Sequence, residues 1–141
     1  MRVLIDTDVV LDLVLEREAF VEAAASLFRL HERAEIEGYV SCITPVNVFY
    51  VTRKAKGIEI ARQAVESLLA SVGLCALNRT VLEDAQRLGF ADFEDAVQHA
   101  SATASNVDAI VSRNISDYKK STLPVFTPTD FLNNHKAQEP E

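Results

Sequence analysis

The sequence has no apolar run of the roughly 18 residues that a membrane-spanning helix requires. Met1 is followed by a basic residue and a short strand-like run that ends in Asp6, which differs from a secretory signal peptide. Cysteine is scarce as well, since Cys42 and Cys75 stand alone and neither belongs to a CxxC pair or another metal-ligand spacing. We therefore expect a cytoplasmic protein without a membrane segment, in which both thiols are reduced and buried.

Positive charge is also in short supply. The chain has 14 Lys and Arg residues against 21 Asp and Glu, a net charge of −7 at neutral pH. Such a balance disfavours nucleic-acid binding, because phosphate backbones attract cations. Bound divalent ions would offset part of the charge, so the acidic total weakens this function class without removing it. The basic residues that could contact RNA fall into two groups: Arg53, Lys54 and Lys56, and Arg113 with Lys119 and Lys120.

The chain alternates apolar, strand-like runs with segments of helical period. Hydrophobic residues make up 48% of the sequence and charged residues 25%, which is typical of a folded domain, and 141 residues suit a single one. Most of the strand-like runs are continuously apolar, as expected for strands buried on both faces. The predicted strands cover residues 2–6, 38–43, 74–77, 108–112 and 124–127.

Helices are predicted between these strands, where apolar residues recur every three or four positions. This alternation predicts a parallel sheet with helices on both sides, a three-layer α/β/α sandwich. Pro45 suits the first position of one helix, and Gly57 its end. We expect the domain to span residues 1–132 and residues 133–141 to form a polar tail that frays.

Carboxylates stand at the ends of predicted strands or at the start of a predicted helix. The carboxyl ends of parallel strands share one edge of a sheet, where ligands bind. Acids that meet there repel one another unless a cation lies among them, and Mg²⁺ accepts such oxygen ligands, so the pattern predicts a divalent-metal site. The acids are Asp6, Asp8 and Asp12; Asp92, Glu94 and Asp95; and Asp117, which follows Asn114.

Ordinary structural roles are open to several of these acids. Asp92 and Glu94 fit the N-cap and the first turn of a helix, where negative charge is favourable. Thr7 or Asp8 is suited to cap the first helix, and Asp12 to be a solvated helix residue. The metal-site interpretation and the capping interpretation therefore both stand for these positions.

For three other residues, the site role and the ordinary structural role are not equally well supported. Asp6 lacks a good structural explanation, because an acid directly after a buried strand is costly without a partner. Asp117 fits an ordinary turn. His99 lies one turn beyond Asp95 and would suit a base, but a surface position is the more common role for such a histidine.

Four segments resemble, in order, the blocks of the PIN-domain (PilT N-terminal-like) nuclease family. They are VLIDTDVVLDLVLERE, SCITPVNVFYVTRK, DFEDAVQHASA and AIVSRNISDYKKSTLPVFTPTDFL, and the match runs from about residue 2 to residue 132. The resemblance implies a central, mostly parallel five-stranded sheet and an Mg²⁺- or Mn²⁺-dependent ribonuclease. Many members are VapC-like toxins that form homodimers and are held inactive by a small antitoxin. It makes Asp6, Asp95 and Asp117 the core metal-site acids, with Asp92 or Asn114 adjoining.

The resemblance has one departure. Thr7 and Ser112 match the small hydroxyl residues that support the site, but the second block often carries a Glu where this chain has Asn47. A neutral amide binds a cation less strongly than a carboxylate does. Asn47 therefore marks either a subfamily or a weakened enzyme.

Our hypothesis is hydrolysis of single-stranded RNA by metal-activated water, with no protein nucleophile. Asn47, Asn114, Thr7 and Ser112 would orient ligands and waters. The alternative is a degenerate PIN-like domain that binds RNA or a protein. A dehalogenase-like phosphatase fits worse because bulky valines follow Asp8, and a response-regulator receiver fits worse because LCALNRT has no acid after the third strand.

Overall fold

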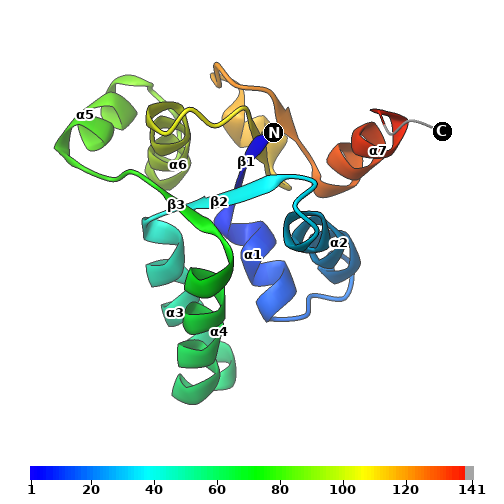
Figure 1. Cartoon of the computed structure of the whole chain (residues 1–141). Coiled ribbons are helices and arrows are strands. Elements are labelled where there is room, and N and C mark those ends of the chain that lie inside the picture. The colour runs from blue at the N-terminus through cyan, green and yellow to red at the C-terminus, as the bar shows by residue number, and fades with distance from the viewer. Residues whose placement is uncertain (139–141) are drawn as a thin grey trace.

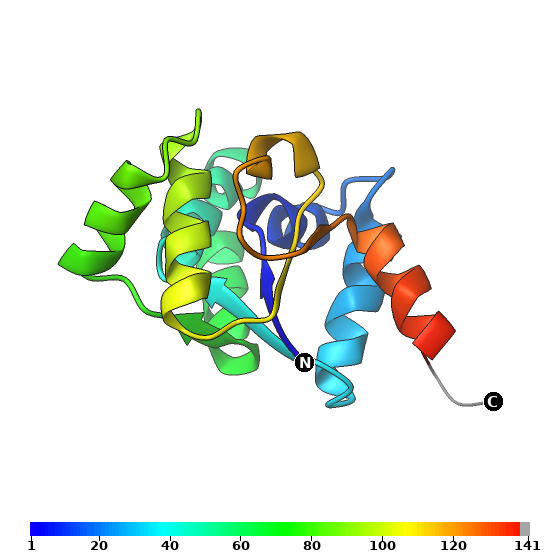
Figure 2. The same cartoon turned by 90° about the horizontal axis from the view of Figure 1, so that it is seen from above.

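A computed structural model, which describes residues 1–138, places a parallel sheet between two layers of helices (Figures 1 and 2). The strand order is β3-β2-β1-β4-β5, and every neighbouring pair is parallel. This confirms the predicted α/β class and the five-stranded sheet. The strands are β1 (Arg2–Ile5), β2 (Glu37–Ser41), β3 (Gly73–Cys75), β4 (Ala109–Val111) and β5 (Val125–Phe126).

Helices cover both faces of the sheet. Helices α1 to α4 and α7 lie on one side of it, and α5 and α6 lie on the other (Figure 1). A short 3₁₀ helix, η1, follows β4. The bounds are α1 (Thr7–Val14), α2 (Val21–Glu32), α3 (Ile43–Lys56), α4 (Ile58–Ser71), α5 (Arg79–Arg87), α6 (Phe93–Ala104), η1 (Ile115–Tyr118) and α7 (Pro128–Gln138).

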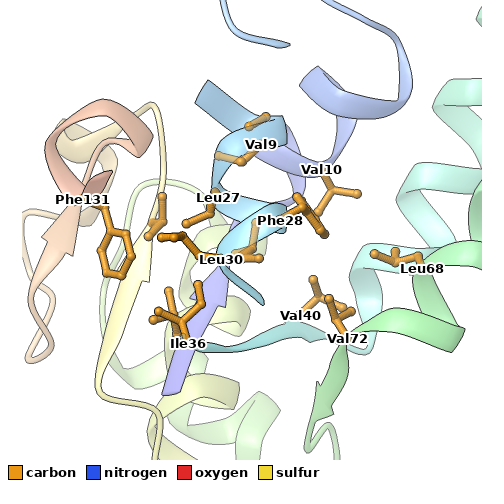
Figure 3. Packing of buried hydrophobic residues seen from close by; sticks show 14 of the residues in the cluster. Val9, Val10, Leu27, Phe28, Leu30, Ile36, Val40, Leu68, Val72 and Phe131 are labelled. Carbon is orange, nitrogen blue, oxygen red and sulfur yellow. The ribbon is translucent and has the colours of Figure 1, made fainter. Parts of the chain in front are cut away.

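The central strand β1 divides the hydrophobic core. Val3 and Ile5 pack in the larger cluster with α1, α2 and α7, whereas Leu4 packs in the cluster on the α6 side. Alternate residues of a strand point to opposite faces, so a continuously apolar run is what a strand buried on both sides needs. Figure 3 shows the larger cluster, in which Leu27 of α2 and Phe131 of α7 lie close to the sheet.

The carboxyl ends of β1 and β4 form the edge of the sheet at which the predicted acidic residues should meet. Ile5 is paired with Val111, and the N–H of Asp6 donates to the Val111 carbonyl at 3.0 Å. Residues that follow these two strands therefore emerge side by side. The topology thus brings the Asp6 segment and the segment after Ser112 together, as the sequence predicted.

Helix α3 begins earlier than expected. The predicted strand over residues 38–43 ends at Ser41, because the helix already includes Ile43. Pro45 is therefore its third residue rather than its first. This position is still within the first turn, where backbone N–H groups have no partner inside the helix. Gly57, with φ of 92°, ends the helix as predicted.

Helix α7 includes residues that the sequence analysis assigned to a tail. It continues to Gln138, so residues 133–138 are helical, and the rest of the expected tail lies outside the described residues. Phe131 anchors it, being buried and edge-on to Phe126 at 5.9 Å. His135 stacks over Phe131 and pairs with Glu35. Residues 133–138 are mostly polar, and all of them except His135 are exposed to solvent.

Both cysteines are free, as expected. Cys75 is buried, while Cys42 is only half-buried and its thiol donates to the Cys75 carbonyl at 3.2 Å. None of the helices within residues 1–138 has the length and apolarity needed to cross a bilayer.

Docking of α7 is tested by Phe131→Ala. Because the ring is buried against Phe126, its removal should cost about 3–5 kcal/mol of unfolding free energy in chemical denaturation. Asn134→Ala, on the exposed side of the same helix, serves as the control and should change stability by less than about 0.5 kcal/mol. Equal effects of the two substitutions would show that α7 is not part of the core.

Candidate active site

Asp6 joins the central strand to the first helix. Its side chain is 3% exposed, and its Oδ1 accepts a hydrogen bond from the N–H of Asp8 at 3.3 Å. Asp6 is therefore the N-cap of α1, whereas the sequence analysis gave that role to Thr7 or Asp8. The difference arises because strand and helix follow each other without a loop, so the residue after the strand already occupies the cap position.

Three side chains from separate parts of the chain hydrogen-bond to the Asp6 carboxylate. Ser112 Oγ and the Tyr118 hydroxyl donate to Oδ2 at 2.6 and 3.2 Å, and Gln98 Nε2 donates to Oδ1 at 3.3 Å. Burial raises the pKa of Asp6, the Ser112 hydrogen bond lowers it, and the neighbouring Asp8 raises it. The carboxylate is thus well supplied with neutral donors but lies next to another acid.

Asp95 faces Asp6 from the first turn of α6. The Tyr118 hydroxyl lies between the two carboxylates, 3.2 Å from Asp6 Oδ2 and 3.4 Å from Asp95 Oδ1. Burial and carboxylate neighbours raise the pKa of Asp95 to about 7. Those neighbours are Asp6, Asp92, Asp117 and Glu94. Acids from three distant segments are therefore close enough to repel one another, as predicted.

Tyr118 is held in place by packing as well as by hydrogen bonds. Its ring is buried and meets Phe90 edge-on, with ring centroids 5.9 Å apart. Burial and the charges of Asp6 and Asp95 raise the pKa of the phenol, so it keeps its proton. A single hydroxyl proton can be donated to only one of the two carboxylates at a time.

Gln98 is a site residue that the sequence analysis missed. Its Oε1 accepts from the N–H of Thr7 at 3.1 Å, while its amide nitrogen donates to Asp6. The Thr7 hydroxyl is also hydrogen-bonded to the hydroxyl of Thr44, at 2.9 Å. The available signal was its spacing, since Gln98 lies three residues after Asp95 and so shares its helix face.

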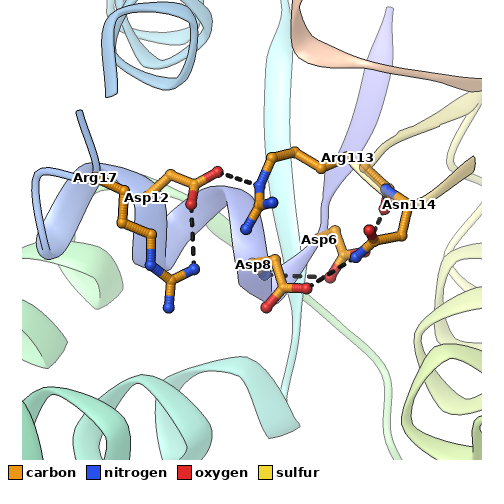
Figure 4. Close-up of polar contacts among 7 residues, drawn as sticks. Asp6, Asp8, Asp12, Arg17, Arg113 and Asn114 are labelled. Atoms are coloured by element: carbon orange, nitrogen blue, oxygen red, sulfur yellow. Dashed lines mark hydrogen bonds and ion pairs between the residues drawn. The ribbon is translucent and has the colours of Figure 1, made fainter. Parts of the chain in front are cut away.

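The segment after β4 is tied to the same region. Asn114 donates from its N–H to Ser112 Oγ at 3.0 Å and from Nδ2 to Asp8 Oδ2 at 3.1 Å (Figure 4). Ser112 and Asn114 thus lie beside Asp6 and Asp8, and their supporting role in a metal site stays a prediction. Asp117 lies on η1 at the exposed rim, near enough to Asp95 to raise its pKa.

Asp12 does not belong to this acidic group. It is 1% exposed and pairs with Arg17 at 3.2 Å and with Arg113 at 2.7 Å, further along α1 than Asp6 (Figure 4). Its place in the predicted cluster and its alternative as a solvated residue were both wrong, because two arginines allow the charge to be buried. Arg113 also stacks over Phe20, 4.0 Å from the ring centroid.

His99 is buried rather than exposed. It is 2% exposed, and its Nε2 accepts a hydrogen bond from the N–H of Thr122 at 3.0 Å. Burial lowers the pKa of the imidazole. The ring lies against Phe90 and ties the segment around Thr122 to α6, which gives it a structural position. The expected surface location was wrong.

The remaining predicted residues differ in their exposure and in their contacts. Asp92 caps α6, since its Oδ1 accepts from the N–H of Asp95 at 3.0 Å. Asn47 is half-buried on α3. Burial raises the pKa of Glu94, and the Asn47 amide lowers it. The basic residues proposed to contact RNA are exposed, Arg113 excepted: Arg53, Lys54 and Lys56 on α3, and Lys119 after η1.

The donors of this site suit a hard divalent cation by their chemistry. Carboxylate oxygens are the ligands that Mg²⁺ and Mn²⁺ prefer, and a cation would relieve the repulsion that raises the pKa of Asp95. Within residues 1–138, no three acidic, histidine or cysteine side chains are gathered closely enough to hold a metal as they stand. Protein donors engage both oxygens of Asp6 instead.

A family model described as PIN domain matches residues 2–116. The chain belongs to the PIN-domain family. No curated protein matches it by sequence. The family resemblance drawn from the four sequence blocks is therefore confirmed over most of the domain.

Solved structures with the same fold include toxin–antitoxin proteins. A chain of VapBC2 from Rickettsia felis, bound to a DNA fragment from its promoter, has a TM-score of 0.72 at 14% identity, covering 90% of this PIN domain chain and 98% of that chain. For VapBC-1 from nontypeable Haemophilus influenzae the TM-score is 0.69 at 16% identity, with coverages of 92% and 99%. For PAE2754 from Pyrobaculum aerophilum it is 0.64 at 16%, with coverages of 98% and 91%. At sequence identities this low, the structural matches show that the fold is shared and nothing more.

The repulsion at Asp95 predicts a pH-dependent gain of stability in Asp95→Asn. A folded-state pKa raised to about 7 means that the native state binds a proton more tightly than the unfolded state, so stability falls as pH rises from about 4 to 7. In EDTA at pH 8 the variant should be more stable by about 1–2 kcal/mol, a value reduced for partial solvent exposure. The gain should shrink towards pH 4.

Urea denaturation of both proteins at several pH values measures this difference. Asp130→Asn, an exposed acid in the first turn of α7, is the control and should change stability by less than about 0.5 kcal/mol at every pH. A destabilised Asp95→Asn at pH 8, or a difference that does not vary with pH, would contradict the assigned environment.

Proposed function

We propose that this PIN domain is a metal-dependent endoribonuclease that cleaves single-stranded RNA and acts as the toxin of a toxin–antitoxin pair. The observation that carries the proposal is the convergence of Asp6, Asp95 and Asp117 at the carboxyl end of a PIN-fold sheet. Asp6 is buried there and is surrounded by other acids rather than by ion-pair partners, since no ion pair of the described residues involves these three.

Each acid has a distinct part in the proposed site. Asp6, Asp95 and Asp117 would ligate Mg²⁺ or Mn²⁺, and Asp92 adjoins them at the start of α6. A bound ion of this class lowers the pKa of a coordinated water and neutralises charge on the scissile phosphate. Asp95, with its pKa near 7, is the acid whose charge responds most to a cation. No protein nucleophile is required.

The surrounding polar residues would hold these ligands in place. Ser112 and Gln98 fix the two oxygens of Asp6, and Thr7 fixes Gln98. Asn114 keeps the post-β4 segment against Asp8. Such outer contacts set ligand orientation and commonly change metal affinity by about 10–100-fold when they are lost.

Exposed lysines beside the site would bind the RNA backbone. Lys119 follows Asp117 and lines a surface pocket with Phe90 and Lys120. Arg53, Lys54 and Lys56 form the second candidate group, at the end of α3. Arg113, in contrast, is engaged by Asp12 and Phe20, so we assign it a structural role.

Protein partners follow from the same proposal. The similar structures include complexes named VapBC, and another from Klebsiella pneumoniae is described as a toxin–antitoxin complex. This chain has an apolar surface pocket between α1, α2 and α4, lined by Leu13, Val14, Phe28 and Leu68. We propose that an antitoxin segment binds there and that the protein forms a homodimer.

A degenerate, RNA- or protein-binding PIN domain is the second candidate. Two observations favour it: a neutral amide at Asn47, and protein donors that already engage Asp6 and Asp95. A degenerate site would bind Mn²⁺ weakly or not at all, whereas the nuclease must bind it.

Cleavage of end-labelled single-stranded RNA decides between these functions. We expect Mn²⁺-dependent cutting that EDTA abolishes, and 5′-phosphate and 3′-hydroxyl products. Asp95→Asn should reduce the rate by at least about 100-fold, because removal of a ligand exceeds the effect of losing an outer contact. It should also remove the increase in melting temperature that Mn²⁺ produces in the wild type.

Asp130→Asn is the matched control, and it should retain both cleavage and stabilisation by Mn²⁺. Folded wild-type protein, freed of any co-purified inhibitor, that neither cuts RNA nor responds to Mn²⁺ would support the binding-domain function instead.

A further inference from the structure

A surface cavity lies at the same edge of the sheet as the acidic site, at the ends of β4 and β5. Arg113 comes two residues after β4, and Thr127 directly follows β5. The N–H of Ser112 donates to the Phe126 carbonyl at 2.9 Å, so the two segments leave the sheet together. Both segments line the cavity, which opens between the start of α2 and the start of α7. These two helices lie side by side (Figure 2).

The cavity combines apolar walls with a few polar groups. Its volume is about 370 Å³, near the lower end of the range of about 300–1,000 Å³ that is common for ligand sites. Such a volume suits one small ligand at the carboxyl edge of a parallel sheet, where ligands bind. The lining includes Ala19, Phe20, Ala23, Pro128, Arg113 and Thr129.

The guanidinium of Arg113 is held in place, but only part of it is used. Its Nε donates to Asp12 at 2.7 Å, and its Cζ lies 4.0 Å from the centroid of the Phe20 ring. These contacts give Arg113 its structural role and also fix its orientation. In the part of the chain that the structure describes, no hydrogen bond uses its two Nη groups, and 24% of the side chain is exposed. Donors of a rigid guanidinium therefore remain for a ligand.

Phe20 adds an exposed aromatic surface beside these donors. Its ring is 41% exposed although it is stacked with Arg113. Unpaired RNA bases stack on aromatic rings and on guanidinium planes, and their edges accept hydrogen bonds. A phosphate suits the cavity less well, because apolar walls remove its hydration, Asp12 neutralises Arg113, and the exposed acid Asp130 adjoins Thr129.

We propose that this cavity binds one base of the single-stranded RNA substrate. The base stacks on Phe20, and its acceptor atoms face the Nη groups of Arg113. Asn114, the next residue, is hydrogen-bonded to Asp8, so the strand has a short path along the sheet edge to the acids. The inference rests on the proposed function, since it takes RNA as the ligand, and it adds a place where a base outside the acidic site is bound.

The decisive measurement is the affinity for a labelled single-stranded RNA by fluorescence anisotropy in EDTA, where binding is separated from cleavage. Phe20→Leu keeps an apolar cover over Arg113 but removes the aromatic face, so it should weaken binding by about 5-fold or more. The dependence of binding on salt should not change, because no phosphate contact is lost. Phe20→Tyr keeps the aromatic face and should bind as the wild type does.

The matched control is Leu82→Ala on α5, across the sheet from the cavity. Leu82 is 41% exposed, like Phe20, and its substitution should leave RNA binding unchanged. A strand of the same length with abasic riboses should bind equally to the wild type and to Phe20→Leu. Thermal melting establishes that each variant is folded. Arg113 is left in place, because its removal would deprive the buried Asp12 of a partner.

Wild-type affinity in Phe20→Leu would overturn the base site while leaving the nuclease function intact, and the cavity would then be open to a protein partner. A reduced salt dependence, or an equal loss of affinity for the abasic strand, would show a backbone contact and also overturn it. A wild type that binds no RNA in EDTA would overturn the base site as well. If Mn²⁺-dependent cleavage is absent too, the proposed function itself fails.

Discussion

The buried carboxylate of Asp6 is the constraint on which the rest of the structure depends. A charge at the end of the central strand loses most of its hydration, so it requires protein donors. Ser112, Tyr118 and Gln98 provide them from the end of β4, from η1 and from α6. These contacts fix three elements relative to β1. Formation of the site and assembly of the domain are therefore linked.

The sheet and its functional edge were predictable because their signals are local. Continuous apolar runs specify strands buried on both faces, and an acid directly after such a run specifies which end of the sheet is polar. Asp6 and Asn114 followed from that reasoning, whereas Asp95 and Ser112 were singled out by the family resemblance. Gln98 was missed although its spacing places it on the helix face of Asp95, because nothing in the local sequence shows that its amide contacts Asp6. Its role depends on Thr7, 91 residues away.

Errors occurred where a distant partner changed the environment of a side chain. Asp12 resembles a solvated helix residue in sequence, yet it is buried because Arg113, 101 residues later, neutralises it. His99 similarly becomes a core residue once the segment around Thr122 folds over it. Residues 133–138 were expected in the tail because they are polar, yet they continue α7, whose contact with the core is made earlier in the helix by Phe131. Pairings of this kind are set by tertiary structure and leave no periodic pattern.

Two of the contacts made by the segment after β4 originate on the same helix. Arg113 binds Asp12, and the adjacent Asn114 binds Asp8, one helical turn away (Figure 4). Displacement of this segment would have to break a buried ion pair and a hydrogen bond together. Helix α1 and the segment should therefore open as one cooperative unit, with slow amide exchange and resistance to proteolysis, even though the segment is not part of any strand.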